Sequence, residues 1–226
     1  EAVIDRGVSA GNDGRFYNSI FRRVLYDHIP PRRRKRLHLL AAHVIESIHQ
    51  NDPERVAEAI SVHYEAAGDW PNTFAWSMRA WQAASGRWHW SQAMNSIERA
   101  QRAAQELGRS GELPLPAVDN LKLLFGVGET YYATGRLKES ETAYTEAIAL
   151  ANRINDRGAL AVALLQQGQT RMGLSTYREA EIATEQALEI YQQMNDHEGT
   201  ALALVQLGGI KVRMGNYDDA ANLAER

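Results

Sequence analysis

Cysteine is absent from this chain of 226 residues, which excludes disulfide scaffolds, thiol catalysis and thiolate metal sites. An excess of charge is also missing, because 25 lysines and arginines stand against 28 acidic residues. This near balance gives no reason to expect a nucleic-acid partner. No apolar run in the sequence approaches the roughly 20 residues that cross a bilayer, and no signal peptide is visible. We therefore expect a cytoplasmic globular protein without a membrane partner.

Proline is scarce, with six residues, and glycine falls at intervals that favour helices joined by short turns. In the second half of the chain, apolar residues recur at the i, i+3, i+4, i+7 spacing of amphipathic helices. This spacing predicts helices at 121–133, 138–153, 159–172, 179–193 and 200–214. Further helices are expected at 17–28 and 33–49, and only 1–8 and 14–17 are candidate strands. The predicted fold class is all-α.

An internal repeat organises the second half of the chain. Gly128, Gly168 and Gly208 lie 40 residues apart, and a small residue there lets two antiparallel helices approach closely. The same interval relates four further sets: Leu124, Leu164 and Leu204; Gly135, Ser175 and Gly215; Leu137, Tyr177 and Tyr217; Ser140, Ala180 and Ala220. One helical hairpin cannot bury its apolar face alone, whereas stacked copies can, so the repeat predicts a solenoid.

The repeat resembles the tetratricopeptide repeat. The resemblance rests on Leu124-x2-Val127-Gly128-x2-Tyr131 in the first helix and on Ser140-x3-Tyr144-x2-Ala147 in the second. The period of 40 residues exceeds the roughly 34 of the commonest form. We expect the extra residues to lengthen the helices and the turns between repeats, at 152–158 and 195–199. Residues 53–107 show a similar pattern with degraded spacing.

The first third of the chain carries a second resemblance. It rests on Arg15-Phe16-x-Asn18-Ser19-x-Phe21-Arg22, on Pro30-Pro31-x-Arg33-Arg34-x-Arg36-Leu37-His38, and on Ala59-x3-His63-Tyr64-x-Ala66-Ala67-Gly68-Asp69-Trp70. These stretches resemble the segment after the nucleotide-binding module of bacterial STAND-type signal-transduction ATPases. In that family a P-loop ATPase domain and a winged-helix domain precede tetratricopeptide repeats. Relatives usually have Phe-x-His where this chain has Phe16-Tyr17-Asn18, so the resemblance does not carry a nucleotide contact over to Asn18.

The two resemblances imply a division of the chain and a function. Residues 1–30 would end a winged-helix-like domain, 31–107 would form degenerate helical hairpins, and 108–118 would be a linker. Residues 119–226 would form three repeats, the last truncated, and the termini suggest a piece of a longer protein. The implied function is the interaction or sensor segment of a multidomain bacterial signalling regulator, which scaffolds or autoinhibits an ATPase or effector module. The alternative is a free-standing adaptor that binds an apolar peptide or helix.

No catalytic constellation is found in the sequence. The Gly11-Asn12-Asp13-Gly14 stretch lacks the Gly-Lys-Ser/Thr of a P-loop. The seven histidines show no HExxH or other metal-ligand spacing. Carboxylate pairs such as Asp218 and Asp219 lie on polar helix faces. We therefore expect no enzymatic activity, no metal and no cofactor in this segment.

The concave face of the solenoid is the first candidate binding surface. Repeat geometry assigns it the first-helix positions Phe125, Glu129, Tyr132, Leu165, Gln169, Met172, Val205, Gly209, Val212 and Arg213. This face is nearly uncharged and lacks the Lys/Asn/Arg set that clamps a peptide carboxylate in some tetratricopeptide proteins. It favours an apolar helix or another domain of the same polypeptide as partner. Routine packing is the competing interpretation of these positions.

A basic run, Arg32, Arg33, Arg34, Lys35 and Arg36, is the second candidate surface. It could dock another domain of the same polypeptide or, less favoured, contact nucleic-acid phosphates. It could also be a solvated helix face whose arginine stems cover apolar surface. All five tryptophans lie within 70–90, where packing in a thin solenoid is the first interpretation. The alternative is that Trp88, with His89, is exposed as a partner anchor.

Overall fold

The computed structural model describes residues 19–110 and 115–224, so Asn18 and the candidate strands at 1–8 and 14–17 lie outside the described residues. Within those two ranges every regular element is a helix. The elements are α1 (Ser19–His28), α2 (Pro31–Ile48), the short 3₁₀ helix η1 (Pro53–Val56), α3 (Ala57–Ala67), α4 (Trp70–Ser85), α5 (Trp90–Ser110), α6 (Ala117–Ala133), α7 (Leu137–Ile154), α8 (Arg157–Gly173), α9 (Tyr177–Gln193), α10 (His197–Arg213) and α11 (Tyr217–Ala224). The predicted all-α fold is confirmed.

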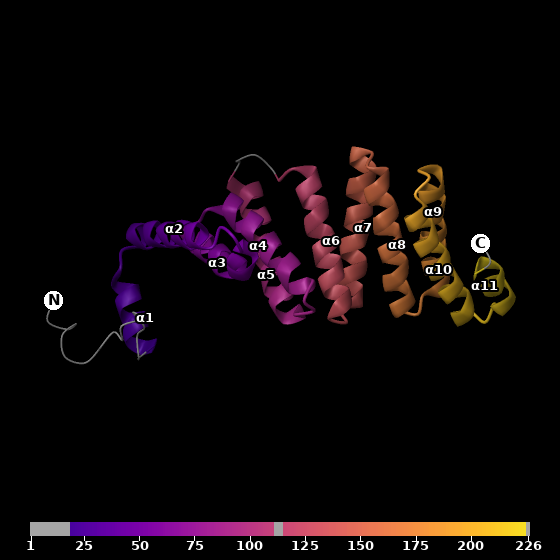
Figure 1. The fold of residues 1–226 in the computed structure, drawn as a ribbon, viewed down its shortest axis with the longest axis horizontal. Coiled ribbons are helices and arrows are strands. Elements are labelled where there is room, and N and C mark those ends of the chain that lie inside the picture. Colours follow the sequence, from indigo (N-terminus) through magenta and orange to yellow (C-terminus); the bar gives the residue numbers. More distant parts are fainter. Residues whose placement is uncertain (1–18, 111–114, 225–226) are drawn as a thin grey trace.

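The helices from α2 onward pair into hairpins that stack along one direction. Each helix packs against the next one in the chain, and Figure 1 shows α4 to α11 standing in a row with α2 lying across its N-terminal end. The first helices of successive hairpins also touch, α4 with α6, α6 with α8, and α8 with α10. No comparable contact joins α7 to α9 within the described ranges. The first helices α6, α8 and α10 therefore lie on the inner side of the later part of the solenoid.

One turn design joins the two helices within each of the last four hairpins. The turn residue has a positive φ and is Trp88, Gly135, Ser175 or Gly215. The next residue donates its backbone N–H to a carbonyl five residues back, as His89 does to Ala84 and Arg136 to Tyr131. The α4–α5 hairpin thus follows the plan of the later repeats.

A second turn design joins one hairpin to the next. A residue with positive φ, namely Gly68, Asn155 or Asn195, is followed by an aspartate that caps the next helix. The carboxylates of Asp156 and Asp196 each accept a backbone N–H at 2.9 Å, from Ala159 and Gly199. These turns are short, so the extra residues of the 40-residue period lie in helices of 17–18 residues. The expected longer turns are not found.

The repeated glycines have different surroundings in the three repeats. A Cβ on Gly128 would lie 2.6 Å from the Tyr144 ring, and one on Gly168 would collide with Thr184. A Cβ on Gly208 would meet nothing within 4 Å. The close approach expected from the sequence is thus present at the first two glycines, whereas the space beside Gly208 is open.

One core cluster crosses from the N-terminal hairpins into the repeats. It joins Met78 and Trp81 of α4 and Ile97 of α5 to Leu123 and Val127 of α6, among others. The Trp81 indole also donates a hydrogen bond of 2.9 Å to Thr130 in α6. Helix α5 continues to Ser110 and α6 begins at Ala117, so helix occupies both ends of the range 108–118 where a linker was expected.

An ion pair recurs between neighbouring repeats. Arg171 of α8 lies 2.9 Å from Glu141 of α7, and 40 residues later Lys211 of α10 pairs with Glu181 of α9. Glu181 is buried, so the recurring pair fixes the first helix of one repeat on the second helix of the repeat before it.

Candidate functional site

The inner face of α6 carries the first three predicted groove residues. Phe125 and Tyr132 are half-buried and Glu129 is exposed. The Phe125 ring lies 6.4 Å, centroid to centroid, from the buried ring of Tyr144. This part of the groove therefore offers aromatic surface next to one carboxylate.

The inner faces of α8 and α10 continue the groove with one exception. Leu165 is buried in the core, so its side chain packs against neighbouring helices and is not accessible to a partner. Gln169 and Met172 are half-buried, whereas Val212 and Arg213 are exposed. Val205 is 76% exposed. The predicted residues thus lie on the same layer of helices, but Leu165 is not at the surface.

The electrostatics of the α6 face favour neutral groups. Burial raises the pKa of the Glu129 carboxyl above its usual value. Burial, and then the nearby Glu129 carboxylate, raises the pKa of the Tyr144 hydroxyl. Both shifts favour the neutral forms of these two side chains, of which Tyr144 is buried in the core and Glu129 is exposed on α6.

Sequence reasoning missed two exposed apolar residues on the inner helices. Val162 and Leu202 are both exposed and lie 40 residues apart, three positions before Leu165 and Val205. The repeat period could have identified them. Lys122 lies 40 residues before Val162 and is exposed, so the same repeat position is exposed in all three repeats. These residues extend the row of exposed apolar side chains toward the start of α8 and α10.

A second apolar hollow, the α10–α11 groove, lies on the last hairpin. Its volume is about 430 Å³, and it is lined by Ala201, Leu204, Val205, Gly208, Val212, Ala220 and Leu223. All seven lining side chains are apolar or glycine, so this groove binds by shape and burial rather than by charge.

The basic run begins helix α2. Arg34 is half-buried, lies 4.0 Å from Asp27 and stacks over the Tyr26 ring at 5.2 Å. Arg32, Arg33, Lys35 and Arg36 are exposed. Arg34 therefore holds α1 against α2, and the other four cations face solvent.

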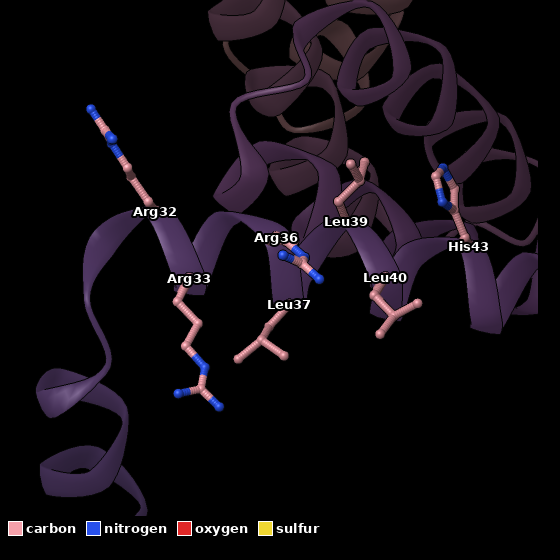
Figure 2. A pocket seen from close by; sticks show the side chains of 7 residues that line it. All are labelled: Arg32, Arg33, Arg36, Leu37, Leu39, Leu40 and His43. Carbon is pink, nitrogen blue, oxygen red and sulfur yellow. The ribbon is translucent and has the colours of Figure 1, made fainter.

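An open groove of about 760 Å³ adjoins those cations. It is lined by Arg32, Arg33, Arg36, Leu37, Leu39, Leu40 and His43. Figure 2 shows Arg33, Leu37 and Leu40 projecting to the same side of α2. The basic run is thus joined to exposed apolar surface, a combination that the sequence analysis had not predicted.

A chain of ring contacts connects α1, α2 and α3. The Tyr26 hydroxyl lies 2.8 Å from His38 Nε2, and His38 Nδ1 lies 2.9 Å from His63 Nδ1. Burial, and then the charge of His38, lowers the pKa of His63. His38 and His63 therefore connect α1, α2 and α3 through side-chain contacts. No group of three or more His, Asp or Glu side chains is placed to hold a metal ion in residues 19–110 and 115–224.

The tryptophans divide between core and surface. Trp81 is buried, Trp70, Trp76 and Trp90 are half-buried, and Trp88 is 77% exposed. Trp88 occupies the positive-φ turn position that Gly135 and Gly215 occupy in later hairpins. The exposed placement fits the partner-anchor interpretation, whereas the other four indoles fit packing.

Stacked helical hairpins with a shared core define the chain as a helical-repeat solenoid, a class that mediates protein–protein interaction. Residues 119–226 are tetratricopeptide repeats, because the profile of the family described as "Tetratricopeptide repeat" matches residues 119–193 and 160–226. No curated protein sequence matches the chain significantly. Among the described residues, no helix has the length and apolar character needed to cross a membrane.

Solved structures share the fold at low sequence identity. The apo form of RapI has a TM-score of 0.62 and 15% identity over 81% of this chain and 67% of that one. A putative kinesin light chain of Podosopora anserina with TPR-like repeats has a TM-score of 0.61 and 14% identity over 87% and 93%. A Rap protein complexed with Competence and Sporulation Factor has a TM-score of 0.58 and 15% identity over 89% of this chain and 54% of its own. These likenesses support the solenoid fold.

Proposed function

We propose that the chain binds an apolar peptide or amphipathic helix along the inner face of α6, α8 and α10. The observation that carries the proposal is the row of exposed or half-buried apolar side chains on these helices, with Phe125, Tyr132, Met172 and Leu202 as its largest members. Helix-in-groove recognition uses such faces. A Rap protein of similar fold has been solved in complex with Competence and Sporulation Factor.

The partner is selected from a phage-displayed peptide library with the 226-residue chain as bait. Fluorescence anisotropy then measures the affinity of each selected peptide for variants of the chain. Tyr132→Ala and Met172→Ala are expected to weaken binding at least tenfold, since aromatic and apolar anchors carry about 1–2 kcal/mol or more each. Ile182→Ala, at an exposed position of α9, is the matched control and is expected to bind normally. Selected peptides that bind all three variants equally would place the site elsewhere.

The wider role that we propose is the sensor segment of a multidomain bacterial regulator related to STAND-type ATPases. In this role the solenoid scaffolds or autoinhibits an ATPase or effector module, and partner binding shifts an off–on equilibrium. The basic run Arg32–Arg36 supports it, because four of its five cations are exposed and three of them, Arg32, Arg33 and Arg36, line a groove with leucines, which suits docking of another domain. The gene provides the test: a P-loop domain encoded before Glu1 is expected, and its absence would favour a free-standing adaptor.

A further inference from the structure

An acidic side chain lies among aromatic residues on the inner face of α6. Glu129 is exposed there, and no ion pair or hydrogen bond to its carboxylate is found in residues 19–110 and 115–224. Phe125 lies four positions before it and Tyr132 three positions after it, on the same side of the helix, and both are half-buried. Helix α6 contacts α4, α5, α7 and α8 and stands in the middle of the row in Figure 1. The helices on both sides of this face therefore belong to the described chain.

A buried hydroxyl reaches the same face from α7. Tyr144 is 2% exposed, and its ring tip crosses α6 at Gly128, where a Cβ would lie 2.6 Å from the ring atom that carries the hydroxyl. Burial, and then the nearby Glu129 and Tyr132 side chains, raises the pKa of this hydroxyl, so it lies close to both of them. Among the described residues no hydrogen bond to it is found. Gly128 thus lets a buried polar group reach the inner face beside the carboxylate.

Comparison with the second repeat shows that packing does not require these two groups. The counterpart of Glu129, 40 residues later, is the neutral Gln169. The counterpart of Tyr144 is Thr184, whose hydroxyl accepts a hydrogen bond of 2.8 Å from Gln206. The second repeat therefore forms the same helical hairpin with a neutral side chain and a bonded hydroxyl at these positions.

The cations on α6, in its following turn and on α8 that are closest in register pair with other acids. They are Lys122 with Asp119, Arg136 with Glu139, and Arg171 with Glu141. Burial raises the pKa of the Glu129 carboxyl, and a cation placed beside it would reverse this shift. The carboxylate is therefore suited to a cation that a ligand supplies.

The chemistry of the surrounding groups also favours a cation. An ammonium or guanidinium group donates hydrogen bonds and accepts none, and both the Glu129 carboxylate and the hydroxyl oxygen of Tyr144 accept them. The ring faces of Phe125 and Tyr132 attract cations through their quadrupoles. The same rings offer apolar surface to the aliphatic stem that carries such a group.

We propose that this cluster, the α6 cation site, binds a lysine or arginine side chain of a peptide ligand. The α6 cation site consists of Glu129, the Tyr144 hydroxyl and the rings of Phe125 and Tyr132. The inference rests on the proposed peptide-binding function and narrows it, because the partner is then an amphipathic peptide with a basic residue among its apolar anchors. Since the second repeat has the neutral Gln169 at the matching position, the basic residue fixes which part of the peptide lies on α6.

Peptides selected from the phage-displayed library with the 226-residue chain are the probes, and fluorescence anisotropy measures their affinity. Those that bind Met172→Ala more weakly than the wild type occupy the inner face, and they are expected to share a lysine or arginine. Replacing this residue by methionine in the peptide is expected to weaken binding to the wild-type chain about tenfold. Glu129→Gln is expected to bind the basic peptide and its methionine form equally, because the charge that distinguishes them is gone.

Two further variants define the site. Tyr144→Phe removes one acceptor and is expected to lose part of the preference for the basic peptide. Glu146→Gln, at an exposed position of α7, is the matched control and is expected to keep the full preference. Circular dichroism verifies that each variant is folded.

The outcomes separate this inference from the proposed function. If peptides that depend on Met172 carry no basic residue, the α6 cation site is disproved while the peptide-binding function stands. The same holds if Glu129→Gln or Tyr144→Phe keeps the full preference for the basic peptide. If no selected peptide depends on Met172, the proposed function fails and this inference fails with it.

Discussion

Single residues decide how closely the helices of a repeat can pack, and the repeated glycines illustrate this. At Gly128 a Cβ would lie 2.6–2.9 Å from ring atoms of the buried Tyr144. We expect Gly128→Ala to destabilise the chain by about 1–3 kcal/mol, the usual cost of overpacking. Gly208→Ala meets no atom within 4 Å and is expected to stabilise α10 by about 0.5–1 kcal/mol. Urea denaturation of both variants measures the difference, and equal effects would contradict the packing role.

A residue-scale pH effect follows from the His38–His63 contact. The pKa of His63 lies below its ordinary value of 6.5 because of burial and then the charge of His38. The unfolded chain therefore binds more protons than the folded chain as the pH falls through 6.5. Stability is present above that pH and is lost below it. We expect the free energy of unfolding to fall between about pH 7.5 and about pH 5.5.

The contribution of His63 is isolated by substitution. His63→Gln is expected to flatten the decrease in unfolding free energy across this pH range, measured by urea denaturation at each pH. His89→Gln, at an exposed position, is expected to leave the decrease unchanged. If both variants retain the full decrease, the protons are taken up by other groups.

Helices are held in their order along the solenoid by the recurring ion pair. Lys211 bonds to Glu181, whose side chain is only 8% exposed, and lies 3.5 Å from Asp219. Removing the lysine leaves the buried carboxylate with only the exposed Arg178, 3.8 Å away, which costs more than an exposed pair is worth. We expect Lys211→Met to destabilise the chain by about 2–4 kcal/mol. Lys122→Met, which breaks the exposed pair with Asp119, is expected to cost less than about 1 kcal/mol. Thermal unfolding of the two variants compares them.

Helix positions were predictable wherever the repeat was regular. The period-based prediction of 200–214 compares with α10 at His197–Arg213, and the earlier start follows from the Asp196 cap. In the α4–α5 hairpin the same turn occurs, but the turn residue is Trp88 rather than a glycine. Counting back from this turn, Trp81 takes the place of Gly128. Because a large residue stands at this position, the repeat is not apparent from the sequence. Trp81 donates a hydrogen bond to Thr130 of α6, and the position of α6 cannot be inferred from the sequence around Trp81.

The binding surfaces were predictable only in part, for a similar reason. Val205 and Val212, which register along a first helix assigned to the concave face, are exposed. It did not reveal that Leu165 is buried, because its environment is set by the neighbouring helix α10, whose Gln206 bonds to the Leu165 carbonyl. The exposure of Leu37 and Leu40 on α2 escaped prediction because arginines dominate the sequence there and leucines at this spacing are typical of any packed helix. Exposure depends on neighbours that a sequence period does not define.

At the scale of the whole molecule, the core cluster around Trp81 couples the N-terminal hairpins to the repeats. Solenoids unfold as one unit only when the interfaces between units are strong, and this cluster includes residues of α4, α5, α6 and α7. All five tryptophans lie within 70–90, so their fluorescence reports on the α4–α5 hairpin, whereas far-ultraviolet circular dichroism reports on every helix. We expect the two signals to give coincident urea transitions in the wild type.

Breaking the cluster should separate the two signals. Trp81→Ala removes a buried indole and its bond to Thr130, at a cost of about 3–5 kcal/mol, and it weakens the interface between α4 and α6 more than the repeats themselves. The fluorescence transition is therefore expected to move to lower urea concentration than the main circular dichroism transition. Trp88→Ala, at a 77% exposed position, is expected to keep them coincident. Coincident transitions in Trp81→Ala would show that the hairpins and the repeats are coupled through contacts other than this cluster.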